Sequence, residues 1–132
     1  MSGICGWHGN ADGNAADVIA AMKRSFAWRR PGSYPSSVGA RFGLAAVGPA
    51  GTVAVHDAGP IHVAVHGHPS WRDGARPVAS LDDFCRDVAA AWQEAGDALL
   101  ARIGGDFALA IVDERTGRVL LAVDRIGVRN VV

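Results

Sequence analysis

The sequence has 132 residues, 49% hydrophobic and 20% charged, so it encodes one folded domain rather than a disordered chain. Thirteen basic and thirteen acidic side chains cancel, which excludes the strong positive field typical of proteins that bind nucleic acid or anionic membranes. The chain start is not typical of a signal peptide, and no apolar run approaches the roughly 20 residues of a membrane span. Two distant cysteines in apolar settings indicate a reducing cytoplasm.

Short apolar segments and capping residues predict the elements of the amino-terminal half. Ile4 to His8 is apolar and bounded by glycines, which is typical of a strand. Asn14 and Asp17 form a capping box, and apolar residues at helical spacing follow until Pro31-Gly32 ends the predicted helix. The sequence therefore predicts a strand and then a helix.

A loop over 32–37 precedes three further predicted strands. Their ranges are Arg41–Val47, Thr52–His56 and Ile61–His66. The segment Gly48–Gly51 is typical of a hairpin connection between the first two. A second loop, Gly67–Ala79, follows the third strand.

The carboxyl-terminal half predicts a helix, a short helical turn and a hairpin. Ser80 with Asp83 forms a capping box, and Gly96 is placed to end the helix. A helical turn is predicted over Ala98–Ile103. The hairpin strands, Phe107–Val112 and Val119–Val123, are continuously apolar, which predicts that both faces of both strands are covered. With no linker or repeat, residues 1–132 form a single α+β domain.

Two segments resemble glutamine-dependent amidotransferases of the asparagine synthetase type. Met1-Ser2-Gly3-Ile4-Cys5-Gly6-Trp7 is similar to the start of that family, in which a cysteine directly follows the initiator methionine. The stretch from Gly105 to Asp113, continuing from Ala122 to Arg129, is similar to the hairpin and following loop of the family. The order of the intervening elements agrees with the family over nearly the whole chain.

The resemblance implies an N-terminal-nucleophile hydrolase fold, a four-layer αββα sandwich of two stacked sheets between helices. In the family this class II glutaminase domain releases ammonia from glutamine, and a second domain uses ATP and Mg²⁺ to activate a carboxylate. That synthetase domain is absent here, and the chain stops at Asn130-Val131-Val132, where the family has further strands. The resemblance therefore implies a truncated glutaminase domain, no cofactor in this chain, and a synthetase domain or a separate synthetase chain as partner.

Ser2 occupies the position of the catalytic cysteine. In such enzymes the free α-amino group of the first residue serves as the base for its own side chain. Removal of Met1 would give Ser2 that role, but a hydroxyl has a far higher pKa than a thiol and is the poorer nucleophile. Ser2 is the candidate catalytic residue, and a small residue tolerated at a terminus is the alternative.

Other residues that hold glutamine in the family are replaced. The arginine that grips the substrate carboxylate corresponds to Gly43, and the aspartate that holds the substrate amine corresponds to Phe84. Arg41 lies two residues from the first position and Asp83 one residue from the second. A small shift in alignment would make Arg41 and Asp83 substrate-binding residues.

The oxyanion site is altered as well. The family's Asn-Gly pair corresponds to His66-Gly67, and the glutamate that follows corresponds to His68. We expect His66 and Gly67 to belong to the substrate site, with the Gly67 N–H as a candidate oxyanion donor. Together with Ser2, these replacements predict that glutaminase activity has been lost.

Degenerate glutaminase domains of this kind occur in relatives such as β-lactam synthetases and lasso peptide cyclases. Our first hypothesis is therefore a structural or docking domain of an ATP-dependent, amide-forming enzyme, with a peptide as one conceivable substrate. The alternatives are an active N-terminal-serine amidohydrolase that supplies ammonia and a stand-alone dimer. His56, His62, His66 and His68 cluster in sequence, but no cysteine or carboxylate pattern accompanies them, so we predict no metal site.

Overall fold

The computed structural model describes residues 2–10, 13–27, 34–74 and 76–127, and these form seven strands, two α-helices and one 3-10 helix. In chain order the elements are β1 (Gly3–His8), α1 (Ala15–Ala27), β2 (Ser36–Val38), β3 (Phe42–Val47), β4 (Val53–Ala58), β5 (Ile61–Trp71), α2 (Leu81–Ala95), η1 (Gly96–Arg102), β6 (Ile103–Asp113) and β7 (Arg118–Val123). The predicted α+β class is thereby supported. The predicted helix stop at Pro31-Gly32 lies outside the described residues.

The strands form two antiparallel sheets. One has the order β1-β3-β2 and the other the order β4-β5-β6-β7. The predicted hairpin at Gly48–Gly51 is therefore wrong, because β3 and β4 belong to different sheets. The segment contains a tight turn, in which the Thr52 N–H donates to the Pro49 carbonyl, and it carries the chain across the roughly 10 Å between packed sheets.

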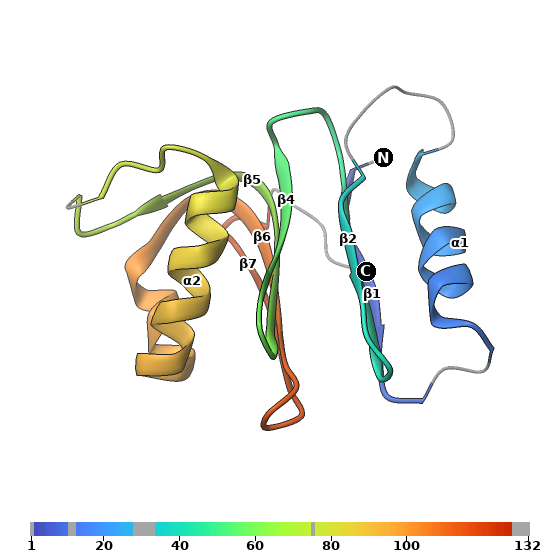
Figure 1. Ribbon diagram of the computed structural model, residues 1–132. Coiled ribbons are helices and arrows are strands. Elements are labelled where there is room, and N and C mark those ends of the chain that lie inside the picture. Colours follow the sequence, from blue (N-terminus) through green and yellow to red (C-terminus); the bar gives the residue numbers. More distant parts are fainter. Residues whose placement is uncertain (1, 11–12, 28–33, 75, 128–132) are drawn as a thin grey trace.

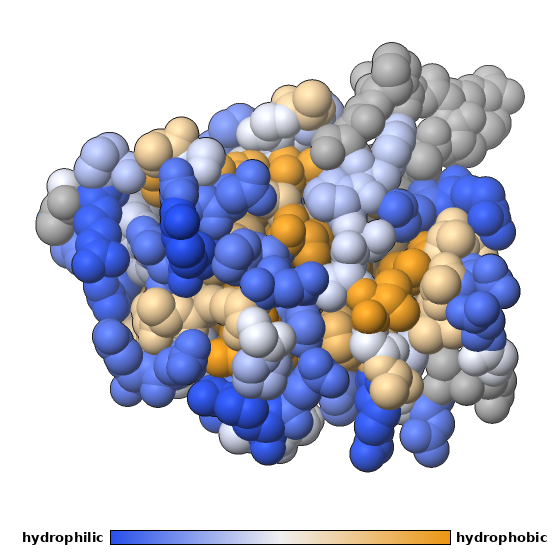
Figure 2. Space-filling model, in the orientation of Figure 1, coloured by the Kyte–Doolittle hydropathy of each residue, from blue (hydrophilic) through white to orange (hydrophobic). Residues whose placement is uncertain are grey.

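The layers follow the order α2, four-stranded sheet, three-stranded sheet, α1 (Figure 1). Alternation of side chains along the strands produces three apolar clusters. The largest lies between α2 and the four-stranded sheet, the second lies between the sheets, and a small one joins α1 to the three-stranded sheet. On the face shown in Figure 2, exposed hydrophobic side chains form separate patches among polar ones.

Capping residues set the helix boundaries as predicted. The Ser80 hydroxyl accepts from the Asp83 N–H at 3.0 Å and donates to the Asp83 carboxylate at 2.9 Å. Gly96 ends α2 with a positive φ of 55°, a conformation in which glycine has no steric penalty. At α1, the Asn14 side chain accepts from the Ala16 N–H at 2.9 Å. These bonds satisfy backbone groups that a helix end leaves unpaired.

Two strands are longer than predicted and one was missed. β5 continues to Trp71 and β6 begins at Ile103, so the predicted loop from Gly67 starts with paired strand. The extension was not predicted because it contains Gly67, Pro69 and Gly105, residue types that normally mark loops. β2 lies in the segment predicted as a loop, and it is only three residues long.

The prediction that both faces of both hairpin strands are covered holds for β6 and is wrong for β7. Residues 107–113 of β6 are all buried, whereas burial alternates along β7. Leu120 and Ala122 pack toward α2, and the residues that alternate with them are exposed. β7 is the last strand of its sheet and extends beyond the three-stranded sheet that covers its neighbours.

Among the described residues, no helix is long and apolar enough to cross a membrane.

Candidate functional site

Ser2 lies immediately before β1, at the end where β3 leaves the three-stranded sheet. Gly3 pairs with Val47, so Ser2 follows in register opposite Gly48. Side chains alternate along a strand, so Ser2 shares the inward face of β1 with Ile4, whose side chain belongs to the core between the sheets. Ser2 itself is half-buried. The candidate nucleophile therefore lies on the edge of the space between the sheets.

His66 occupies the same end of this space. It lies on β5, its side chain is 1% exposed, and a Cβ added to Gly48 would lie 3.3 Å from its Cδ2 atom. Because Gly48 is the register neighbour of Ser2, the structure brings Ser2 and His66 to one place. Both sequence-predicted residues therefore lie next to Gly48, and their role in a substrate site stays a prediction.

Gly67 follows His66 and has a φ of 117°, which only glycine adopts without strain. Its N–H donates to the Thr52 carbonyl at 2.8 Å. An oxyanion donor has to point at the reacting oxygen of the substrate. In this geometry the Gly67 N–H points at a backbone acceptor instead.

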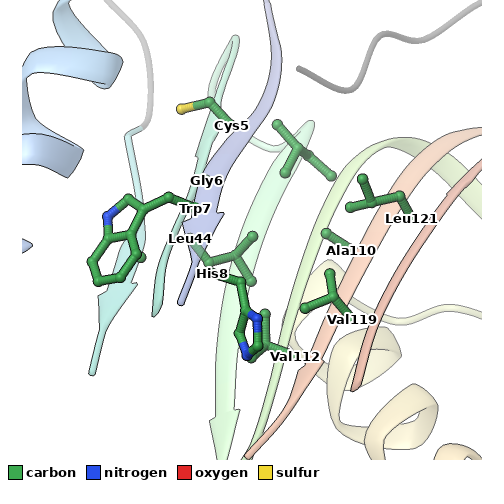
Figure 3. Close-up of a pocket in the computed structure, with 11 residues that line it drawn as sticks. Cys5, Gly6, Trp7, His8, Leu44, Ala110, Val112, Val119 and Leu121 are labelled. Atoms are coloured by element: carbon green, nitrogen blue, oxygen red, sulfur yellow. The ribbon is translucent and has the colours of Figure 1, made fainter. Parts of the chain in front are cut away.

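Gly43 lies directly across from Trp7 in the β1–β3 pair. A Cβ added to Gly43 would lie 2.6 Å from the Trp7 indole nitrogen, too close for any side chain unless the indole moves. Figure 3 shows that Trp7 and Cys5 point away from the gap between the sheets. The indole therefore fills the space in which an arginine at position 43 would begin.

Arg41 is exposed and lies at the opposite end of the β1–β3 pair from Ser2. Its carbonyl accepts from the Gly9 N–H at 2.8 Å, beyond the pair of His8 with Phe42. Six paired residues separate it from Ser2, a length of roughly 20 Å at strand spacing. The structure does not bring the two together, and an arginine side chain is too short to cover the difference.

Asp83 and Phe84 belong to the start of α2, on the far side of the four-stranded sheet from Ser2. Asp83 is bonded to the capping Ser80 and forms an ion pair with Arg86. Phe84 is 1% exposed, and its ring centroid lies 5.1 Å from that of Trp71. Asp83 therefore serves the helix end, and Phe84 is part of the core.

Sequence reasoning missed a cluster around the buried His62, whose two carboxylate partners are exposed. The Nδ1 atom of His62 lies 2.6 Å from an Asp57 carboxylate oxygen, and Nε2 lies 2.7 Å from a Glu114 carboxylate oxygen. Ser37 Oγ lies 3.4 Å from Nδ1, and the Phe42 ring lies 4.2 Å from the imidazole, centroid to centroid. Both carboxylates are satisfied when both ring nitrogens carry protons.

This cluster joins the two sheets. Ser37 and Phe42 come from the three-stranded sheet, whereas Asp57 and His62 face each other in the β4–β5 pair. Although burial raises the pKa of Asp57, hydrogen bonds from His62 and Ser37 lower it below its usual value. His62 lies four residues along β5 from His66, so the cluster does not reach Ser2.

The two cysteines are buried, as expected for small hydrophobic residues. Burial raises the pKa of both thiols, and for Cys5 the charge of Lys23 opposes part of that effect. Neither cysteine is therefore a candidate nucleophile. In the part of the chain that the structure describes, no group of three or more His, Cys, Asp or Glu side chains is placed to hold a metal ion.

A comparison with known proteins finds a similarity for part of the chain. A family model of the glutamine amidotransferase domain matches residues 79–132. The match begins just before the Ser80 cap and includes α2, η1, β6 and β7. A search of curated proteins found no match. Residues 79–132 are therefore similar to part of a glutamine amidotransferase domain, whereas Ser2, Gly43 and Gly67 lie outside the matched stretch.

Proposed function

We propose that this chain is a degenerate glutaminase domain, in which the site no longer holds glutamine, and that it acts as a structural or docking part of an asparagine-synthetase-like enzyme. In this proposal the two facing sheets and their outer helices are the four-layer N-terminal-nucleophile hydrolase fold. The ATP-dependent step, with its Mg²⁺, belongs to a synthetase domain or a separate synthetase chain in the cytoplasm. An amine already present in the acceptor, such as a peptide undergoing cyclisation, replaces ammonia.

The observation that carries the proposal is the lack of a cation on β3 for the substrate carboxylate. A free amino acid is held by its charged groups, and a guanidinium that grips a carboxylate in a bidentate pair is the strongest such contact. Position 43 is closed by the Trp7 indole. The inward residues of β3, namely Phe42, Leu44 and Ala46, are apolar. Arg41 lies roughly one strand length from Ser2.

Two further features support the same conclusion. The position that corresponds to the amine-binding aspartate is the buried Phe84, which offers no charge to an ammonium group. The Gly67 N–H is bonded to the Thr52 carbonyl, so the oxyanion would lose its backbone donor. Losing one donor alone lowers a rate by roughly 10² to 10³ in enzymes that depend on it.

One observation favours the rival proposal of an N-terminal-serine amidohydrolase. Ser2 and the buried His66 both lie next to Gly48, at one end of the space between the sheets. Imidazole is the commonest general base in proteins. A working serine would therefore have a polar neighbour, although it would lack the substrate-binding groups.

Ammonia release from glutamine distinguishes the two proposals. We would assay the natural chain, Ser2→Cys and Ser2→Ala with a coupled glutamate dehydrogenase reaction, after mass spectrometry has confirmed removal of Met1. The degenerate-domain proposal predicts no release above background from any of the three, since restoring the thiol does not restore glutamine binding. Release by the natural chain that disappears in Ser2→Ala would establish the hydrolase instead.

A further inference from the structure

His62 is a buried histidine held between two carboxylates. Its side chain is 9% exposed, whereas those of Asp57 and Glu114 are 56% and 42% exposed. Nδ1 lies 2.6 Å from an Asp57 oxygen, and Nε2 lies 2.7 Å from a Glu114 oxygen. An ionised carboxylate only accepts hydrogen bonds, and a neutral imidazole carries one N–H. A neutral His62 would therefore direct the lone pair of one ring nitrogen at a carboxylate oxygen.

The imidazolium form of His62 satisfies both contacts, because it donates from both ring nitrogens. Hydrogen bonds between a charged donor and a charged acceptor are short, about 2.7–2.9 Å, and roughly twice as strong as neutral ones. The two contacts of His62 are at or just below the short end of that range. Burial disfavours a charged ring, but an adjacent opposite charge favours it, and here there are two.

The charged and titratable groups around His62 come from several elements. They are Asp57 and its neighbour His56 on β4, Glu114 in the turn after β6, and His8, which faces the space between the sheets from β1. His56 is half-buried and His8 is exposed, so water screens their charges more than those in direct contact. Asp113 binds Arg115 and Trp92 on the other face of the sheet, toward α2. The two contacting carboxylates therefore dominate the field at the ring.

The ring also contacts the other sheet at its edge strand. β2 is the last strand of the three-stranded sheet and faces β4 (Figure 1). Its one inward residue, Ser37, is 7% exposed, and the Ser37 Oγ atom lies 3.4 Å from Nδ1 of His62. Phe42, at the start of β3, packs against the imidazole with 4.2 Å between ring centroids. A change at His62 therefore acts directly on the place where β2 rests on the other sheet.

We propose that His62 is a proton-dependent clamp between the two sheets. As an imidazolium it holds Asp57 and Glu114 and fixes β2 through Ser37. When one ring nitrogen releases its proton to water, the carboxylate opposite that nitrogen turns to solvent and β2 loosens. The clamp operates whether or not the chain hydrolyses glutamine.

The clamp makes stability depend on pH in a defined direction. In the unfolded chain an imidazole loses its proton near pH 6.5, whereas the two carboxylates keep the proton on His62 in the folded chain. The clamp therefore contributes its full stability below about pH 6.5, down to the pH at which the carboxylates are protonated, and it contributes less as the pH rises.

Ring-nitrogen NMR of the chain labelled with ¹⁵N-histidine reads the protonation of His62 directly, because the imidazolium and the two neutral tautomers have different patterns of nitrogen shifts. We expect the imidazolium at pH 7 and a neutral ring only at higher pH. Asp57→Asn combined with Glu114→Gln removes both charges, and the ring should then be mostly neutral at pH 7. Asp106→Asn, the same kind of change beside the exposed His68, is the matched control and should leave His62 charged.

Unfolding by urea at pH 6 and pH 9 tests whether the proton stabilises the fold. His62→Gln should lower the folding equilibrium constant about fivefold at pH 6, as expected for hydrogen bonds to partly exposed carboxylates, and less than twofold at pH 9. Amide hydrogen exchange at pH 6 tests the attachment of β2. The amides of Ser37 and Val38 should exchange faster in His62→Gln than in Asp106→Asn.

Four results would overturn the proposal. They are a neutral His62 at pH 7 in the natural chain, an imidazolium that persists in the double variant, an equal effect of His62→Gln at both pH values, and unchanged exchange in β2. If the double variant does not fold, each single substitution takes its place, and an unchanged titration of His62 in both would equally contradict the clamp.

Discussion

The substitution Gly43→Ala examines directly whether the Trp7 indole closes the position of the family's arginine. The added Cβ would lie 2.6 Å from the indole nitrogen, and forcing extra atoms into a packed site costs typically 1–3 kcal/mol. Gly43 has ordinary strand backbone in β3, so alanine introduces no φ strain. We therefore expect the free energy of unfolding to fall by about 2 kcal/mol.

Repeating the substitution in a Trp7→Ala background isolates the contact. Without the indole, the same Gly43→Ala change should be neutral or stabilise the fold by about 0.4–1 kcal/mol, because alanine restricts the unfolded chain more than glycine does. Urea unfolding followed by far-UV circular dichroism measures all four proteins of the cycle. Equal costs in both backgrounds, within about 0.5 kcal/mol, would refute the claim that Trp7 fills this space.

Three further outcomes follow from the packing. Hydrogen bonds from Arg115 hold the pKa of Asp113 well below its usual value. This carboxylate therefore stabilises the fold above about pH 4, and the stabilisation is lost as the pH falls further. Asp113→Asn should make the free energy of unfolding depend less on pH in the acid range, as measured by urea unfolding at a series of pH values. Cys5 and Cys85 should not react with Ellman's reagent at pH 8 until urea is added, because both are buried with raised thiol pKa values. His62→Leu should lower the free energy of unfolding by about 1 kcal/mol, since two hydrogen bonds are lost but their carboxylates, Asp57 and Glu114, are exposed enough to be solvated by water, and an unchanged urea midpoint would contradict this role.

Local signals in the sequence were sufficient for the helices and for most strands. Ser80 marks the start of α2 because its side chain accepts a hydrogen bond from a backbone N–H, and Gly96 marks the end because glycine adopts a positive φ without strain. Both signals are local in the sequence. The apolar run of β6 likewise indicated a strand covered on both faces. Such features depend on a few neighbouring residues and can therefore be predicted from the sequence.

Features set by contacts between the two sheets could not be predicted from local sequence. A short glycine- and proline-containing segment at 48–51 fits a hairpin and a crossing between sheets equally well, and only the pairing of β3 with β1 decides. The apolar sequence of β7 resembles that of β6, but its exposure depends on where the other sheet ends. The bond of His62 to Glu114 spans 52 residues, although the β4–β5 hairpin could have suggested its contact with Asp57.

The candidate site was predicted in part. The resemblance placed Ser2 and His66 in one site, and in the structure both lie next to Gly48. It gave Arg41 and Asp83 as substitutes for lost ligands, yet one lies at the far end of β3 and the other serves the cap of α2. In a strand, a residue close in sequence to an expected ligand position need not lie near the site, because two residues along a strand already span about 7 Å.

The central claim is that glutamine has no binding site in this chain, and a titration with glutamine followed by backbone amide NMR tests it most directly. We predict no saturable shift up to about 10 mM, well above the usual upper limit of about 1 mM for KM values. Saturable shifts at Gly3, His66 and Gly67, lost in Ser2→Trp but kept in Val38→Asp, would contradict the account and restore a working glutamine site at Ser2.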